Sequence, residues 1–283
     1  MIDLHCHTNA SDGEKTPTEL IDFAINKGIS AIAITDHDTV DGLDEAIKYS
    51  NNKKIMVIPG IELEASTTKG QMHILGLFID YNNNELKKEL IKIKQARENR
   101  NKKIIEELNK MGFEISLEEL KKVSGGETIG KPHFAKVFLN KGYIQTKEEM
   151  FENYFNKPPL NSLKKASYEP EQIINMIKAA NGLAILAHPQ SLKLNDDDLL
   201  KKVIELKKYG LDGMECFHSN QTKEEMDKFQ KIAKDLNLII TKGTDYHGPI
   251  IKAKIELGTG INNNLLLKND DIILKKLLEA KNK

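Results

Sequence analysis

The chain is poor in cysteine and arginine. Only Cys6 and Cys216 occur among its 283 residues, which suggests no disulfide framework and fits a reducing compartment. Arginine occurs only at positions 97 and 100, so almost every basic residue is lysine. Arg97 and Arg100 are three positions apart and share one face of an expected helix. They are candidates for binding an anion, with surface ion pairing as the alternative.

The chain also lacks an excess of charge and any long apolar run. Its 42 Lys and Arg residues balance 42 Asp and Glu residues, so no global field attracts it to nucleic acid or to a membrane. The N-terminal sequence MIDLHCH has neither a basic segment nor a long apolar stretch. No run reaches the length of a transmembrane helix. We expect a cytoplasmic protein that is not bound to a membrane and has no obligate protein partner.

Short apolar segments alternate with helical patterns along most of the chain. This alternation is typical of βα units and a mainly parallel sheet. One helix is expected over 17–27, because Thr16 is a good N-cap, Pro17 suits the first position and Glu19 completes a capping box. The expected strands are 2–4, 29–35, 55–59, 73–79, 183–187, 213–217 and 238–241.

One long segment interrupts this alternation. Between about residues 84 and 168 the pattern is helical only, with helices expected at 85–111, 117–123, 133–140 and 147–155. An all-helical segment of this length within a βα series suggests an inserted subdomain. We therefore predict a barrel formed by 1–84 and 169–283, with 85–168 as a helical insertion that caps the substrate site. The alternative is that these helices are elaborated parts of the barrel itself.

Histidines stand where several expected strands end. His5 and His7 end the first strand, His37 the second, and His188 the strand after the insertion. In α/β barrels the catalytic groups gather at the carboxyl ends of the strands. Side-chain alternation puts His5 and His7 on one face of their strand and Cys6 on the other. A lone histidine near a strand is more often a packed core residue, but core histidines have no reason to accompany acids.

Acids do accompany these histidines. The further candidates near strand ends are Asp12, Asp36, Asp38, Glu62, His73, Asp245 and His247. Imidazole nitrogen together with carboxylate oxygen suits Mn, Zn or Fe, whereas a calcium site uses oxygen ligands. About nine ligands are too many for one ion. Two or three ions that share a carboxylate fit better, and such centres serve displacement at phosphorus.

At this point the sequence resembles the PHP family, named for polymerase and histidinol phosphatase. The matching segments span nearly the whole chain in order. They are HCHT at 5–8, SDG at 11–13, ITDHD at 34–38, PGIE at 59–62, His73, AHP at 187–189 and TDYHG at 244–248. The resemblance implies an α/β fold, a distorted (β/α)7 barrel, and a metal-dependent phosphoesterase that acts by attack of a metal-bound hydroxide.

The resemblance also implies a trinuclear metal centre. The mixed nitrogen and oxygen ligand set makes Mn²⁺ the first choice of divalent ion, with Zn²⁺ or Fe²⁺ as alternatives. One ion would be held by His5, His7, Glu62 and Asp245. Glu62 would bridge to a second ion held by His73 and His188, and the third would be bound by Asp12, His37 and His247. The implied catalytic residues are Asp245, Glu62 and His37. Asp36 is interpreted as an acid that orients a ligand histidine.

A narrower resemblance, carried by residues 96–100, 128–135 and 215–218, is to PHP proteins that act on nucleotides. It implies hydrolysis of nucleoside 3′,5′-bisphosphates and of short 5′-phosphorylated oligoribonucleotides. The implied substrate-binding residues are Lys131, His133, His218, Arg97 and Arg100. Lys131 stands where the family often has arginine, and lysine lacks the bidentate fork. The alternatives are a histidinol phosphatase or broad phosphomonoesterase, and a non-catalytic metal-binding partner module.

Overall fold

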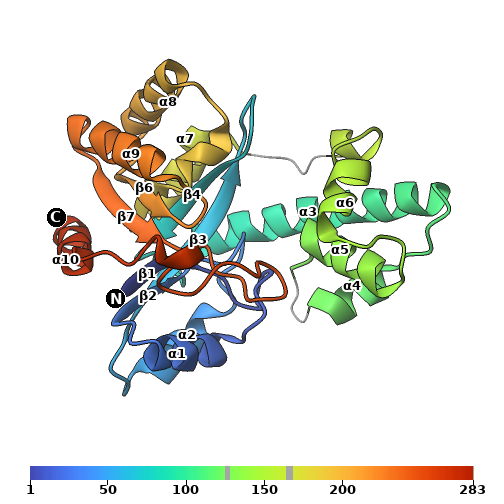
Figure 1. Cartoon of the computed structure of the whole chain (residues 1–283), viewed down its shortest axis with the longest axis horizontal. Coiled ribbons are helices and arrows are strands. Elements are labelled where there is room, and N and C mark those ends of the chain that lie inside the picture. Colours follow the sequence, from blue (N-terminus) through green and yellow to red (C-terminus); the bar gives the residue numbers. More distant parts are fainter. Residues whose placement is uncertain (125–127, 164–167, 283) are drawn as a thin grey trace.

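The computed structural model describes residues 1–124, 128–163 and 168–282. Seven strands form one sheet in sequence order, and the sheet curves into a barrel (Figure 1). The strands are β1 Ile2–Cys6, β2 Ala31–Ile34, β3 Met56–Ala65, β4 Met72–Leu77, β5 Leu183–Leu186, β6 Gly213–His218 and β7 Ile239–Gly243. Just past β7, the Asp245 N–H donates to the His5 carbonyl (2.8 Å) and the His7 N–H donates to the Tyr246 carbonyl (2.9 Å). These bonds join the two outer strands, and the α/β barrel expected from the sequence is confirmed.

One strand runs against the others. β4 is antiparallel to both β3 and β5, whereas the remaining neighbours pair in parallel. An antiparallel strand begins at the end of the barrel where the parallel strands finish. His73, near the start of β4, therefore reaches the same end as His5 and His7.

The third strand is longer than its apolar run indicated. We expected it to stop at residue 59, with Glu62 just beyond its end, and this was wrong. β3 pairs with β2 through Pro59 and then continues from Gly60 to Ala65 as the partner of β4. The antiparallel partner extends the hydrogen-bond ladder, so Glu62 is fixed within a strand.

Six helices cover the barrel: α1 Pro17–Asn26, α2 Leu43–Ser50, α7 Pro170–Ala179, α8 Asp196–Lys208, α9 Lys223–Asp235 and α10 Asp270–Lys281. The capping box of α1 is confirmed, with reciprocal hydrogen bonds between Thr16 and Glu19 of 3.2 and 2.9 Å. We did not predict α10. Asp270 anchors it by accepting from the fully buried Lys242 ammonium and from the Ile2 N–H, each at 3.0 Å.

The segment between β4 and β5 forms a second lobe (Figure 1). It contains α3 Asn84–Lys110, α4 Leu117–Ser124, α5 Lys131–Asn140, α6 Lys147–Met150, a π-helical turn at Phe151–Phe155 and a 3₁₀ turn at Leu160–Ser162. The first half of α3 packs Leu86 and Leu90 into the barrel core, whereas Ile104 and Leu108 in its second half belong to a separate core of this lobe. Two cores joined by one helix support the division into barrel and insertion, which remains a prediction. Among the described residues, no helix has both the length and the apolar composition to cross a bilayer.

Candidate metal centre

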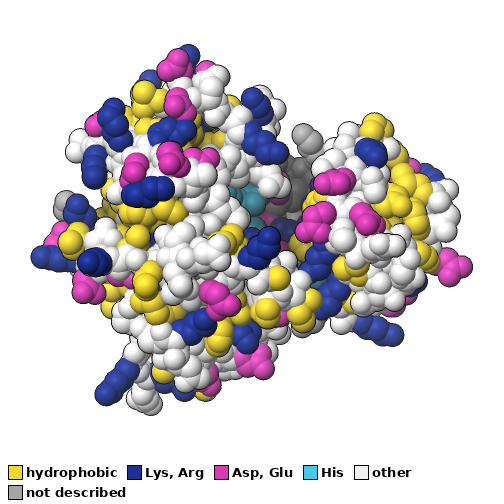
Figure 2. All heavy atoms as spheres, in the orientation of Figure 1, with side chains coloured by type: hydrophobic (Ala, Val, Ile, Leu, Met, Phe, Trp, Pro, Cys, Tyr) yellow, Lys and Arg dark blue, Asp and Glu magenta, His cyan; other side chains and the backbone are white. Residues whose placement is uncertain are grey.

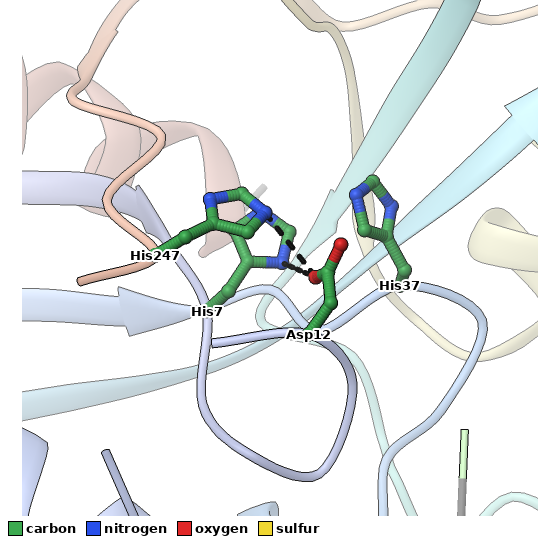
Figure 3. A group of neighbouring side chains, drawn as sticks. All are labelled: His7, Asp12, His37 and His247. Atoms are coloured by element: carbon green, nitrogen blue, oxygen red, sulfur yellow. Dashed lines mark ion pairs between the residues drawn. The ribbon is translucent and has the colours of Figure 1, made fainter. Parts of the chain in front are cut away.

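The strand ends bring all nine predicted ligands together. In four groups, each residue offers one nitrogen or oxygen, and these atoms lie within 4.8 Å of one another. The groups are His7, Asp12, His37 and His247; His5, His7 and Asp245; His5, Glu62 and His188; and His37, Glu62 and His73. Figure 3 shows the first group, in which Asp12 Oδ1 lies 3.2 Å from His247 Nε2 and 3.9 Å from His7 Nδ1. Because the groups share members, they form one continuous cluster.

Glu62 lies at the middle of this cluster. Its side chain is almost completely buried, and five imidazoles surround the carboxylate. By distance to the nearer carboxylate oxygen, they are His37 Nδ1 and His73 Nδ1 at 2.9 Å, His188 Nε2 at 3.0 Å, and His5 Nε2 and His7 Nε2 at 3.4 Å. A carboxylate in this position can be shared between neighbouring cations.

Several of these atoms are buried without a hydrogen-bond partner. They include His5 Nε2, both ring nitrogens of His7 and Glu62 Oε2. A buried polar atom without a partner costs about 1–3 kcal/mol, so a cluster of them at one point calls for a ligand. Imidazole nitrogens and carboxylate oxygens are the donors that borderline divalent ions prefer. The residues present therefore fit divalent metal ions.

Glu215 orients one predicted ligand histidine, and our sequence reasoning missed this role. Its buried carboxylate accepts the Nδ1–H of His5 at 3.0 Å and the backbone N–H of His188 at 2.7 Å. His5 then directs the lone pair of Nε2 into the cluster. A Cβ at Gly243 would lie 2.2 Å from His5 Cβ and 2.5 Å from Glu215 Oε1, so this contact requires glycine there. An acid within the apolar strand β6 was the available signal.

Two further predicted ligand histidines are oriented in the same way. His188 Nδ1 lies 2.9 Å from Ser191 Oγ, whose own proton goes to the Gln71 carbonyl. The hydroxyl must therefore accept from Nδ1–H. His247 Nδ1–H donates to the Asp245 carbonyl at 2.9 Å. In both rings Nε2 keeps its lone pair and faces a carboxylate of the cluster.

Asp36 does not orient a histidine, so that prediction was wrong. Its carboxylate accepts from the Thr8 N–H (2.8 Å), the Thr8 hydroxyl (2.7 Å) and the Ser11 hydroxyl (2.6 Å). Burial raises the pKa of Asp36 to about 6 although these hydrogen bonds act in the opposite direction. Asp36 instead fixes the loop that carries Asp12, because Thr8 and Ser11 lie in that loop.

The cluster keeps its carboxylates ionised. Burial acts to raise the pKa of Glu62, but the imidazoles around it, His37 foremost, hold that pKa well below its usual range. Burial likewise opposes ionisation of Asp12, and His247 and His37 lower its pKa well below the ordinary value. Burial would lower the pKa of His37, but Glu62 and Asp12 raise it to about 9. In this arrangement the His37 ring carries positive charge that the Glu62 and Asp12 carboxylates attract.

His133 and His218 are held differently from the predicted ligand histidines. His133 Nδ1 accepts the Gly130 N–H at 2.9 Å, and His218 Nδ1 accepts the Asn220 N–H at 3.2 Å. In a neutral ring, Nε2 must then carry the proton. Burial lowers the pKa of His133 to about 4 and also lowers that of His218, so both rings are neutral near pH 7.

These two rings face the cluster as donors. His218 Nε2 is buried without a hydrogen-bond partner and lies 3.5 Å from Asp245 Oδ2. Asp12 and His247 both act on the pKa of His133, which places that ring beside the cluster. Their Nε2–H groups suit an anionic substrate, whereas the lone pairs of the ligand histidines suit cations.

The three basic residues predicted to bind substrate have different surroundings. Arg97 pairs with Asp38 at the edge of the cluster, while Arg100 donates to its neighbour Asn101 at 2.9 Å. The ammonium of Lys131 lies 5.0 Å from the centroid of the Phe155 ring, a cation–π contact with the insertion. Figure 2 shows histidine atoms at the bottom of a hollow between the two lobes, so substrate can reach the cluster from this side.

Three residues at this end of the barrel have a strained backbone. Asp38, His188 and Asp245 have φ values of 56°, 27° and 59°, in the left-handed region that non-glycine residues rarely occupy. Such conformations cost about 1–3 kcal/mol each and persist where the surrounding structure imposes them. Two of the three are predicted ligands, and the third pairs with Arg97.

Comparison with known proteins agrees with this geometry. A 5′-3′ exoribonuclease of Haemophilus influenzae is 32% identical over 260 residues, covering 92% of this chain and 94% of that protein. A 3′,5′-nucleoside bisphosphate phosphatase of Chromobacterium violaceum is 30% identical over 251 residues, covering 88% and 87%. A solved structure from Bifidobacterium adolescentis, described as a candidate metal-dependent phosphoesterase, has a TM-score of 0.84 at 28% identity, covering 98% and 95%.

The family model described as PHP domain matches residues 3–241. That range contains seven of the nine clustered residues, and it ends within β7, just before Asp245 and His247. The fold, the cluster and these similarities agree on a metal-dependent hydrolase of phosphoester bonds, and the chain belongs to the PHP domain family.

Proposed function

We propose that the protein removes phosphate from nucleoside 3′,5′-bisphosphates and also acts on short 5′-phosphorylated oligoribonucleotides. The relatives named above, an exoribonuclease and a bisphosphate phosphatase, support this choice. The observation that carries it is the meeting of two kinds of histidine. One kind directs lone pairs into the cluster of predicted ligands, and the other directs N–H donors to the space beside it.

In this proposal three divalent ions occupy the cluster, and Mn²⁺ is the preferred ion. His5, His7 and Asp245 would hold the first, His73 and His188 the second, with Glu62 shared between them, and Asp12, His37 and His247 the third. When bound, such ions polarise phosphoryl oxygens, make hydroxide available near neutral pH and stabilise the leaving oxygen.

The chain's own residues would do the rest. The proposed catalytic residues are Asp245, Glu62 and His37. Glu62 and His37 each belong to two of the groups, and Asp245 Oδ1 lies 3.3 Å from His7 Nε2 and 3.6 Å from His5 Nε2. Each of these residues lies close to more than one other predicted ligand, so each would help to hold the ions and the phosphoryl group in fixed relative positions.

The phosphate that does not react would be held by groups of the insertion. His133 donates from Nε2, and Arg97 and Arg100 lie together on α3, close enough that Arg97 helps lower the pKa of Arg100, which burial brings to about 10. Lys131 would have to leave the Phe155 ring to take part. His218, on the barrel side, would contact the reacting phosphoryl group near Asp245. Every proposed ligand lies in the barrel, so the insertion would select the substrate.

A phosphate-release screen tests this function. The substrates are a nucleoside 3′,5′-bisphosphate, a nucleoside monophosphate, a short 5′-phosphorylated oligoribonucleotide and histidinol phosphate, each with Mn²⁺, Zn²⁺ and Mg²⁺ in turn. We expect the bisphosphate to have the highest kcat/KM. A preference for histidinol phosphate, or equal rates on all monoesters, would replace the proposal by the corresponding alternative.

The His133→Ala variant tests the role of the insertion. Loss of one hydrogen bond to a charged phosphate, about 1.5–3 kcal/mol, should lower kcat/KM for the bisphosphate roughly 10- to 100-fold. A chromogenic monoester without a second phosphate should react almost as before. Equal losses on both substrates would mean that His133 supports the metal centre or the fold instead.

A further inference from the structure

A lysine contacts one of the proposed metal ligands. The Lys252 ammonium pairs with Asp245 Oδ2 and lies 3.5 Å from the Asp245 carbonyl oxygen. An ammonium next to a cation site competes for the carboxylate and repels the cation. Neither the sequence motifs nor the comparisons point to Lys252, so this contact needs a separate explanation.

The two oxygens of Asp245 have different surroundings. Oδ1 faces the cluster, 3.3 Å from His7 Nε2 and 3.4 Å from His247 Nδ1. Oδ2 faces away from these rings, toward Lys252 and toward His218 Nε2 at 3.5 Å. Two groups that carry N–H therefore converge on Oδ2, while Oδ1 remains with the ligand histidines.

The segment that carries Lys252 is held from two sides. Glu14 Oε1, on the barrel, accepts the Ile251 N–H at 2.7 Å. Lys147, on α6 of the insertion, donates to the Ile250 carbonyl. The Lys252 N–H itself donates to the Gly248 carbonyl at 2.8 Å. Lys252 thus extends from a turn whose backbone is fixed by these hydrogen bonds, which limits where its ammonium can lie.

We propose that Lys252 is a positioning residue: it reserves Oδ2 of Asp245, so that this carboxylate offers a single oxygen, Oδ1, to the metal centre. The left-handed backbone of Asp245 (φ 59°) limits the other ways in which the side chain could be aimed. Without Lys252, Oδ2 would be free to turn toward the cations as well. This inference rests on the proposed metal centre but not on the choice of nucleotide.

The proposal predicts a change in metal affinity opposite to that expected for a residue that merely stabilises a metal ligand. Removing a partner that merely stabilises a ligand lowers metal affinity, typically 10- to 100-fold. Removing the Lys252 ammonium should raise the affinity for metal ions, because its repulsion of the ions is relieved and Oδ2 becomes available to them. Turnover should fall, because the carboxylate no longer keeps one defined oxygen in the centre.

The test uses the full chain as Lys252→Met, Lys252→Arg and Lys254→Met. Lys254→Met is the matched control, because Lys254 is exposed and lies two residues further along the same segment. Mn²⁺ binding to apoprotein prepared with chelator is measured by calorimetry, and kcat is measured on a chromogenic phosphate monoester at saturating Mn²⁺. Thermal melting of each apoprotein checks the fold.

For Lys252→Met we expect Mn²⁺ binding roughly two- to fivefold tighter, the range of a partly exposed charge pair, and a kcat lowered by up to about tenfold. Lys252→Arg should restore both values, and Lys254→Met should match wild type. Weaker or unchanged Mn²⁺ binding in Lys252→Met would overturn the proposal. Failure of wild type to bind Mn²⁺ would instead overturn the metal centre itself.

Discussion

Replacing Glu62 by glutamine changes the middle of the cluster while keeping the size of the side chain. The variant loses one negative charge, and its amide presents N–H groups to imidazole nitrogens that lie 2.9–3.4 Å from the carboxylate. If Glu62 is shared by two cations, two charge-assisted contacts of about 1.5–3 kcal/mol each are lost. The sum, about 3–6 kcal/mol, corresponds to a loss of roughly 10²- to 10⁴-fold in metal affinity.

Two measurements follow this change. Mn²⁺ per chain is determined by elemental analysis after dialysis, and kcat is determined on a chromogenic phosphate monoester. We expect Glu62→Gln to retain at most one Mn²⁺ per chain and to lose activity by at least 10²-fold. Glu224→Gln, the same chemical change at an exposed position of α9, should match wild type. Circular dichroism of both variants shows whether the fold is kept. A folded Glu62→Gln variant with full metal content and near-normal turnover would refute the central role of Glu62.

Three further outcomes are expected. Glu215→Gln should weaken Mn²⁺ binding about 10- to 100-fold in calorimetry, because His5 loses the carboxylate that fixes its ring; unchanged affinity would show that His5 needs no such partner. Treatment with a chelator should abolish phosphate release, and added Mn²⁺ should restore it best; full activity in rigorously metal-free protein would contradict the whole mechanism. Asp270→Ala should reduce the free energy of unfolding in urea by about 3–5 kcal/mol, because it leaves the buried Lys242 ammonium without its partner. A double variant with Lys242→Met and Asp270→Leu should recover much of that loss, and if it does not, α10 is anchored by other contacts.

The seven strands could be predicted because each contains a short apolar run, and most of these runs alternate with helical patterns. The directions of the strands could not. The sequence around His73 shows a histidine at the start of a strand, and only the antiparallel course of β4 explains why it meets histidines that follow other strands. The length of β3 was missed for the same reason, since its second half is defined by β4 rather than by its own composition.

The clustered residues could be found from the sequence because histidines and acids recur at strand ends. Their orientation could not, because it depends on partners far away in the chain. His5 and Glu215 are separated by 210 positions, and no local pattern joins them. Asp36 was interpreted as an orienting acid because such sites commonly need one, yet its side chain turns to Thr8 and Ser11. Lys252 was overlooked because a lysine in a polar segment resembles any surface lysine.

The insertion also affects how the barrel can assemble. β4 and β5 are neighbours in the sheet, with Leu77 opposite Leu183, yet 106 positions separate these two residues. Closing a flexible loop of that length costs about 2 kcal/mol more than closing one of about ten residues. The segment has a core of its own, and its end returns to the barrel, where the Ser66 N–H donates to the Tyr168 carbonyl at 2.8 Å. A lobe that folds locally shortens the effective loop, so the second lobe lowers the entropic barrier to joining the two halves of the barrel that it interrupts.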